Sequence, residues 1–288
     1  MKKKSLNISK KIDPEKAEVI IAIKSIADRC SIPIFITGAA ARDLVIDVAF
    51  GIKTIRATED IDFGIMVQSY EQFEVLAGQL INSGRFMKTE KRYRYLFGEH
   101  QQIDILPFGP VADKGKNIRL PGNEPREMNM MGYEEAFKNA FEVQIHEQPP
   151  VSIKMADPAG LAIMKLVSWD EKYPDRDKDA KDFHLIMCHY LEFCDRDSIY
   201  EIHSDLMSLP DFDFEITGAR ILGRDIAAMV SPMTCKKIEE ILLRETDPSG
   251  SNKLLSDMRG VMFSEENARK NSAFLEQVKI GFLERKKQ

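Results

Sequence analysis

The sequence predicts a mixed α/β fold of the α+β type, in which a domain built on a mixed β-sheet precedes a mostly helical domain. Short apolar runs alternate with helical patterns in the first half, whereas beyond about Asp157 the apolar residues recur with a helical period and strand signals are few. The chain has 288 residues, 43% of them hydrophobic, which is enough for two cores. Residues 109–150 are rich in Pro, Gly and Asn, so we expect domains over 1–150 and 151–288.

Helix caps and turn residues set the elements expected in the first half. Asp13 as N-cap and Pro14 in the first turn begin a helix, Gly51 closes the second helix, and Ser69 caps the third. Short apolar runs between these helices predict strands, and two runs that flank a polar, Gly-containing loop predict a hairpin whose second strand carries Asp104. In chain order the expected elements are helix 14–29, strand 32–36, helix 39–50, strand 60–67, helix 70–82, strands 93–97 and 102–108, and strand 141–145.

The second half is expected to be helical throughout. Asp157 and Pro158 repeat the cap and first-turn proline that begin the first helix. Further helices follow from the apolar spacing. They are expected over 177–193, 198–206, 220–229, 235–244 and 265–285.

Composition and charge exclude several classes of protein. The sum of 41 Lys and Arg against 46 Asp and Glu gives a net charge of −5, unlike a protein that coats duplex nucleic acid. The longest apolar runs fall far short of the roughly 20 residues that a membrane helix needs. Charged residues interrupt the stretch after the basic start of the chain, and the four cysteines form no CxxC pair. We therefore expect a cytoplasmic protein with no membrane partner.

Three aspartates in the first half indicate a metal site. Asp60 and Asp62 stand two apart on a predicted strand, so their side chains share a face about 6.5–7 Å apart, where two carboxylates repel unless a cation separates them. Asp104 lies in an apolar strand and needs a partner for its charge. Oxygen-only ligands favour Mg²⁺ or Mn²⁺ over zinc. Three aspartates around two such ions form the arrangement that supports in-line phosphoryl transfer.

A second feature in this half suits phosphate. Gly38 separates a predicted strand from a helix, and a glycine there lets backbone N–H groups approach phosphate oxygens at the helix N-terminus. Ala39 follows it in the turn, and Arg42, one turn into the helix, is a candidate side-chain contact.

The three segments that contain these residues are GAAARDL from Gly38, RATEDIDF from Arg56 and IDILPF from Ile103. Together they resemble the DNA polymerase β-type nucleotidyltransferase superfamily and, within it, the AbiEii group of toxin-like nucleotidyltransferases. The resemblance implies that the turn at Gly38 binds nucleotide phosphates and that Asp60 and Asp62 hold two Mg²⁺ ions. It also implies that a third carboxylate, Asp104, completes the site and helps to activate the acceptor. The superfamily usually has Gly or Ser where this chain has Ala39, which bears on nucleotide preference.

The AbiEii group also has a lysine-containing helix followed by a segment of the form R, K-D, D. AIMKL around Lys165 and RDKDAKDF from Arg176 resemble these two segments. By position, Lys165 is expected on the triphosphate, with Lys178 or Asp179 on the opposite wall of the cleft. The resemblance covers about residues 32–185 and does not extend beyond about 193.

The resemblance implies transfer of NMP from an NTP to an acceptor, with release of pyrophosphate. For a toxin-like member, the acceptor is a tRNA or a protein hydroxyl, and a separately encoded antitoxin is a partner. One alternative is a small-molecule acceptor, as in antibiotic-modifying nucleotidyltransferases. Another is a catalytically silent nucleotide-binding or interaction module with the same fold.

Structural interpretations stand beside each functional one. Asp104 could pair with Arg92 or Arg94 in its hairpin as a salt bridge. Lys165 could extend its ammonium to water, and Lys178 and Asp179 could belong to a solvated helix face. Other groups leave two interpretations open: zinc ligands or helix core for His184, Cys188, His189 and Cys194, and a nucleic-acid track or a solvated surface for Lys53, Arg56, Lys88, Lys91, Arg92 and Arg94.

Overall fold

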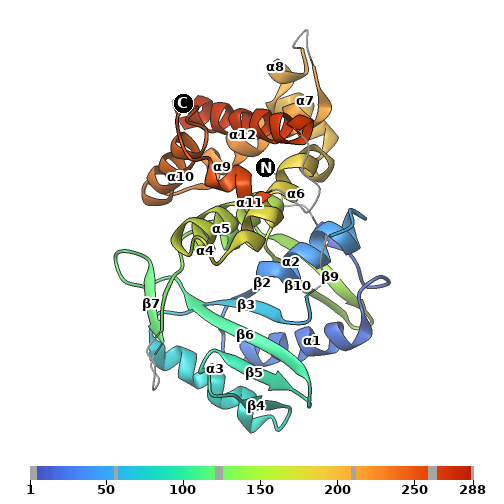
Figure 1. Ribbon diagram of the computed structural model, residues 1–288. Helices are drawn as coiled ribbons and strands as arrows, with labels where there is room; N and C mark the ends of the chain where they lie inside the picture. Colours follow the sequence, from blue (N-terminus) through green and yellow to red (C-terminus); the bar gives the residue numbers. More distant parts are fainter. Residues whose placement is uncertain (1–4, 55–57, 121–125, 209–211, 259–264, 287–288) are drawn as a thin grey trace. The chain divides into compact units, whose positions relative to one another are not determined.

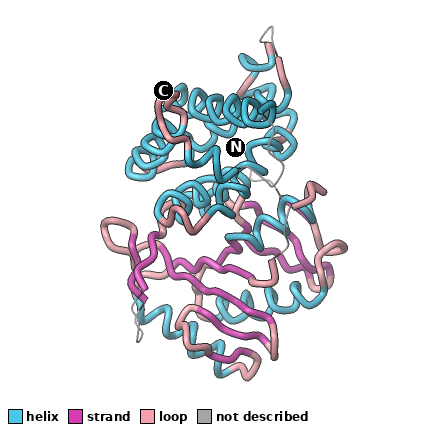
Figure 2. The backbone as a smooth tube through the Cα atoms, in the orientation of Figure 1, coloured by secondary structure: helices cyan, strands magenta, loops and turns pink. Residues whose placement is uncertain are grey.

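A computed structural model of the chain describes residues 5–54, 58–120, 126–208, 212–258 and 265–286. The chain has a mixed β-sheet with helices in its first part, and the elements described in its second part are all helices, as the sequence predicts (Figures 1 and 2). Two compact units divide between Asp157 and Pro158. This division falls after the expected boundary at residue 150, because the strand over Pro150–Met155 pairs with strands on both of its sides and so belongs to the first unit.

The first unit contains an eight-stranded mixed sheet with the order β1-β9-β10-β2-β3-β6-β5-β4, and a separate hairpin of β7 and β8. β3 and β6 at the centre are parallel, and their outer neighbours β2 and β5 run antiparallel to them. The strands are β1 (Ser5–Asn7), β2 (Ile34–Thr37), β3 (Ile61–Met66), β4 (Phe86–Lys88), β5 (Arg94–Phe97), β6 (Gln101–Phe108), β7 (Asn117–Leu120), β8 (Arg126–Asn129), β9 (Phe141–Glu147) and β10 (Pro150–Met155).

The helices of the first unit are α1 (Pro14–Arg29), α2 (Gly38–Arg42), the π-helix η1 (Asp43–Ala49), α3 (Tyr70–Asn82) and α4 (Tyr133–Asn139). α1 and α3 have the predicted bounds. The Asp13 carboxylate accepts hydrogen bonds from the N–H groups of Glu15 and Lys16, which confirms it as the N-cap of α1. Helix α4 and the short strand β4 were not expected, since each is too brief to show a period.

The expected helix over 39–50 is divided into two kinds of helix. Its first five residues form α2, and the next seven form η1. In a π-helix each N–H bonds to a carbonyl five residues earlier, as the N–H of Phe50 does to Val45 at 3.2 Å. Asp43 begins this wider turn, and its side chain bonds to the backbone of Thr58, outside the helix. The change of helix type therefore coincides with a long-range contact that local sequence does not reveal.

The two faces of the sheet differ in what they hold. On one face, Ile61, Phe63 and Ile65 of β3 are fully buried, and α1 and α3 pack against each other on one side of the sheet (Figure 1). On the other face, α4 closes one end with an aromatic cluster in which its side chains contact Phe35 and Phe108 edge-on or tilted. The polar side chains lie along the same face, on the strand positions next to this cluster. The apolar end of the face is thereby sealed, and the polar end holds the candidate site.

The second unit consists of α5 (Pro158–Glu171), α6 (Asp177–Phe193), α7 (Arg196–Ile202), α8 (Ser204–Met207), α9 (Phe214–Met229), α10 (Pro232–Glu245), α11 (Lys253–Met258) and α12 (Glu265–Lys286). α9 packs closely on α12 through two glycines. A Cβ at Gly223 or Gly281 would lie 2.0 Å from a carbonyl oxygen of the facing helix, so only glycine permits this approach. Across the described part of the chain, no helix is both long and apolar enough to cross a membrane.

Candidate active site

Four side chains form a row across four neighbouring strands. Thr37 of β2 is the register partner of Asp62 on β3, Asp62 is the partner of Asp104 on β6, and Asp104 is the partner of Arg94 on β5. Residues directly opposite each other on paired strands project from the same face of the sheet. The fold thus places two of the three predicted aspartates side by side, although they are far apart in the sequence.

Asp60 joins this row from the end of β3. It precedes the strand by one residue and lies two positions before Asp62. The side chains of Asp60 and Asp62 therefore project from the same side of the sheet. Its side chain is 38% exposed, compared with 13% for Asp104. Asp104 is therefore the more enclosed of these two carboxylates, and Asp60 is the more open to solvent.

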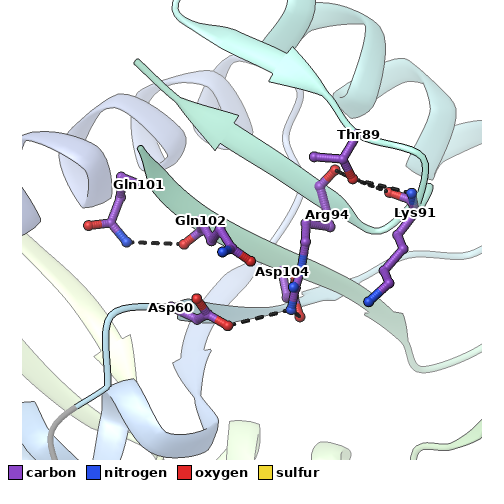
Figure 3. A network of polar contacts seen from close by, with 7 residues as sticks. All are labelled: Asp60, Thr89, Lys91, Arg94, Gln101, Gln102 and Asp104. Atoms are coloured by element: carbon purple, nitrogen blue, oxygen red, sulfur yellow. Dashed lines mark hydrogen bonds and ion pairs between the residues drawn. The ribbon is translucent and has the colours of Figure 1, made fainter. Parts of the chain in front are cut away.

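Arg94 connects two of the three carboxylates (Figure 3). Its Nε donates to Oδ1 of Asp104 at 2.6 Å and its Nη2 donates to Oδ2 at 2.8 Å, a two-point pairing. The same Nη2 lies 3.5 Å from Oδ2 of Asp60. The hydrogen bond to Asp104 raises the pKa of Arg94 above its already high value, so the guanidinium stays charged. The salt bridge that the sequence left open for Asp104 is present in the structure, and it extends to Asp60.

The residues fit a divalent cation in kind but are not arranged around one. Carboxylate oxygens are the donors that Mg²⁺ and Mn²⁺ prefer. A cationic group already bridges Asp60 and Asp104, which shows that the space between them suits positive charge. Within the described ranges, no group of three or more His, Cys, Asp or Glu side chains is arranged to hold an ion. Movement of Arg94 would therefore be needed before both carboxylates could take one.

Gly38 lies directly against Asp62. Its φ is +63°, a conformation that favours glycine, and a Cβ there would lie 2.1 Å from Oδ2 of Asp62. Gly38 thus makes room for the aspartate as well as beginning α2. Gly38 and the adjacent Ala39 are both partly exposed beside the row of carboxylates. Their predicted contact with nucleotide phosphates stays a prediction.

Arg42 does not face solvent as a phosphate ligand would. It is only 1% exposed, and its Nε donates to Oδ1 of Asp43 at 2.8 Å. The predicted phosphate contact is therefore not what this structure presents. The physical reason is burial, because a guanidinium inside the fold needs a carboxylate partner, and Asp43 is adjacent to it.

Three contacts hold the segment that leads into Asp60. The N–H of Thr58 donates to Oδ2 of Asp43 at 2.9 Å, and the carbonyl of Thr58 accepts from Nζ of Lys16 at 3.2 Å. The side-chain amide of Gln101 donates to the carbonyl of Glu59. Residues from a helix, a π-helix and a strand thereby fix the chain just before the first aspartate. Sequence reasoning missed this function of Asp43, although the residue stands in the GAAARDL segment.

Lys165 and Asp179 contact each other inside the helical unit. Nζ of Lys165 lies 2.8 Å from Oδ1 of Asp179 and 2.7 Å from Oδ2 of Asp182. All three side chains are at least nine-tenths buried, and the two aspartates come from α6, which packs on α5. Lys165 and Asp179 therefore do not lie on opposite walls of a cleft, because buried charges pair with one another. Lys178, the other residue expected on that wall, is exposed on α6.

The zinc interpretation of the helical unit finds no support in its geometry. Nε2 of His184 lies 2.8 Å from the amide oxygen of Asn271, and Sγ of Cys188 lies 3.4 Å from the same nitrogen. Burial raises the pKa of Cys188 to about 12, and within the described ranges no group of three or more His, Cys, Asp or Glu side chains is arranged to hold an ion. In the basic group, Arg56 lies outside the described residues, and Arg92 pairs with Glu74 at 3.3 Å.

No family model and no curated protein sequence matches the chain. Among solved structures, ANT(2'')-Ia in complex with adenylyl-2''-tobramycin is 18% identical, with 59% of this chain and 87% of that chain covered and a TM-score of 0.35. The apo form II of a CCA-adding enzyme is 14% identical, with 91% and 68% covered and a TM-score of 0.32. A Thermotoga maritima CCA-adding enzyme complexed with tRNA is 15% identical, with 92% and 67% covered and a TM-score of 0.27. Scores this low do not establish a shared fold.

Proposed function

We propose that the chain is a metal-dependent nucleotidyltransferase that transfers NMP from an NTP to an acceptor hydroxyl and releases pyrophosphate. The observation that supports this most directly is the register that sets Asp62 opposite Asp104 on parallel strands, with Asp60 two residues before Asp62. The local sequence marked each of the three aspartates as a candidate site residue, but only strand pairing brings Asp104 beside Asp60 and Asp62. The class of activity follows from the sequence resemblance, and the row of carboxylates supplies the chemistry that it requires.

The reaction forms one bond and breaks one. The acceptor oxygen attacks the α-phosphorus of the NTP, the bond from that phosphorus to the bridging oxygen of the β-phosphate breaks, and pyrophosphate leaves. Asp104, which is more enclosed than Asp60, takes the proton of the acceptor hydroxyl. Asp60, Asp62 and Asp104 would hold Mg²⁺ or Mn²⁺, which supplies charge neutralisation at the phosphates. The backbone N–H groups at the turn of Gly38 and Ala39 would approach the nucleotide phosphates.

The acceptor and the biological partners are proposed from the resemblance to the AbiEii group. The acceptor is a tRNA or a protein hydroxyl, and a cognate antitoxin is the expected protein partner. A net charge of −5 is compatible with a polyanionic acceptor, because bound cations and local basic residues offset the charge of the three aspartates. Lys88, at the end of β4, and Lys91, in the turn that leads into β5, are both exposed, and β5 begins with Arg94.

The decisive experiment measures transfer of label. The protein is incubated with Mg²⁺, each α-labelled NTP and total RNA, with a protein fraction or with small molecules, and is compared with Asp60→Ala and Asp104→Ala. Asp28→Ala is a matched control, because this aspartate lies on the surface of α1 and pairs with Lys24, one turn earlier in the same helix, at 2.7 Å. We expect label transfer in the wild type and the control and at least about a hundredfold loss in the two site variants.

The labelled product identifies the acceptor. Label in RNA or protein supports the toxin-like reaction, and label in a small molecule supports the alternative acceptor. Unimpaired NTP binding without any aspartate-dependent transfer would identify a catalytically silent module and contradict the proposed activity.

A further inference from the structure

We infer that Arg94 is a built-in counter-cation of the carboxylate site, which bridges Asp60 and Asp104 in the absence of a divalent cation and competes with that cation for Asp104. The inference rests on the proposed function, since it deepens the description of the same site. It assigns Arg94 as a positioning residue that sets how tightly metal binds. The nucleotide and the acceptor are not needed for this effect.

The strand pairing fixes Arg94 in its position. Arg94 is the register partner of Asp104 across the β5–β6 hairpin, so the two side chains must share a face. The turn before β5 is also braced, because Oγ1 of Thr89 lies 3.0 Å from the carbonyl oxygen of Arg94 and accepts the N–H of Lys91 at 3.2 Å (Figure 3). The side chain of Arg94 is 24% exposed, which leaves it partly screened from water. This is therefore a constrained contact rather than one of the loose ion pairs common on protein surfaces.

The pairing uses the same atoms that a metal would need. Both oxygens of Asp104 accept an N–H from the guanidinium, and one oxygen of Asp60 faces the same nitrogen, Nη2. A dication bound by these oxygens would stand close to a full positive charge that cannot be lost by deprotonation. Either the guanidinium withdraws from Asp104 or the dication binds weakly. Metal affinity and the Arg94–Asp104 bond are therefore in competition.

The neighbouring arginine offers a matched control. Arg92 lies two residues before Arg94, carries the same charge and pairs with Glu74, and its side chain is 52% exposed. It makes none of the described contacts with the three aspartates. Removal of its charge tests the general electrostatic effect of one cation on the hairpin, whereas removal of the Arg94 charge tests the specific contact.

The test measures Mn²⁺ affinity of the full-length protein without nucleotide, by electron paramagnetic resonance of free Mn²⁺. We expect Arg94→Gln to lower the Kd for Mn²⁺ by about tenfold or more, and Arg92→Gln to change it less than about twofold. Arg94→Lys retains the charge, so its Kd is expected to stay close to that of the wild type. The double variant Arg94→Gln, Asp104→Asn is expected to lose the increase in Mn²⁺ affinity. This loss would show that the ion binds at the carboxylate of Asp104.

A second measurement uses the wild type and so does not depend on the folding of a variant. The Nε–H of Arg94 is followed by ¹⁵N NMR during a titration with Mg²⁺, and its signal is assigned by its absence from Arg94→Lys. The signal is expected to shift as the bond to Asp104 is lost, with the same midpoint as Mg²⁺ binding. A signal that stays constant while Mg²⁺ binds would overturn the inference.

The outcomes separate this inference from the proposed function. Equal Mn²⁺ affinity in the wild type and Arg94→Gln, or weaker binding in the variant, would overturn the competition and leave the nucleotidyltransferase proposal intact. Failure of both proteins to bind Mn²⁺, with or without NTP, would overturn the metal-dependent function as well.

Discussion

Replacement of Lys165 by Met is expected to destabilise the helical unit strongly. The lysine ammonium lies within 2.8 Å of one buried carboxylate and 2.7 Å of another, those of Asp179 and Asp182. Met preserves most of the side-chain volume but removes the charge, which leaves two like charges in the interior. Arg176, 3.6 Å from the second oxygen of Asp179, compensates only in part. The two carboxylates then lack the charge that offset their removal from water, and the folded state is destabilised.

The expected magnitude follows from the burial of the three groups. Loss of one partner from a buried ion pair typically costs about 3–5 kcal/mol, because the remaining charge is left uncompensated. With a urea dependence of about 2 kcal/mol per molar, the denaturation midpoint should fall by roughly 2 M. The triple variant Lys165→Met, Asp179→Asn, Asp182→Asn removes all three charges. It should recover at least about half of the loss, since neutral replacements of buried ion pairs are often well tolerated.

The chain has a natural reporter for this experiment. Its single tryptophan, Trp169, lies on α5 one turn after Lys165, is 1% exposed and donates its indole N–H to Asp257 at 2.8 Å. Urea unfolding followed by tryptophan emission therefore monitors the helical unit rather than the sheet. Lys178→Met is the matched control, because this lysine is exposed on α6, and its midpoint should stay close to that of the wild type.

One result would refute the reasoning. If Lys165→Met unfolds within about 0.5 kcal/mol of the wild type yet weakens nucleotide binding tenfold, the lysine is a ligand contact and not the centre of a buried ion-pair cluster. That result would restore its predicted place on the triphosphate.

Three further predictions concern other parts of the molecule. Gly38→Ala should cost about 1–2 kcal/mol in thermal unfolding and lower transfer activity at least tenfold, because the new Cβ would lie 2.1 Å from Asp62; unchanged activity would contradict the close contact. Asp43→Asn should lower stability, because it removes the carboxylate paired with the buried Arg42, and should also lower kcat if Asp43 positions the segment before the first aspartate; an effect on stability alone would count against that positioning role. Burial raises the pKa of Asp225 to about 6 from its usual 3.8, so its contribution to stability is full below pH 3.8 and lost as pH rises through about 6. Burial lowers the pKa of His203 to about 4 from 6.5, so its contribution is present above pH 6.5 and lost as pH falls through about 4. The two trends oppose each other. As pH drops from 6.5 to 4, the free energy of unfolding in urea should therefore fall more steeply for Asp225→Asn than for the wild type. Equal pH dependence in the two proteins would show that Asp225 does not offset His203.

Much of the fold was predictable because its signals are local. The cap at Asp13 and the apolar period predicted the bounds of α1, and the apolar period predicted those of α6. The hairpin of β5 and β6 was predicted from a polar loop between two apolar runs. β10 was missed because Pro150 resembled a loop residue, although a proline is tolerated as the first residue of a strand. The π-helix was missed because it depends on a contact between Asp43 and Thr58.

The sequence by itself determined which residues are candidates for chemistry, since the spacing of Asp60 and Asp62 and the glycine before α2 are properties of short segments. Tertiary structure decided what those residues contact. Strand register set Asp104 between Asp62 and Arg94. Helix packing enclosed Lys165 with its aspartates, and burial turned Arg42 toward Asp43. The physical reason is that a charge removed from water must find a partner, and long-range packing determines which partner is near.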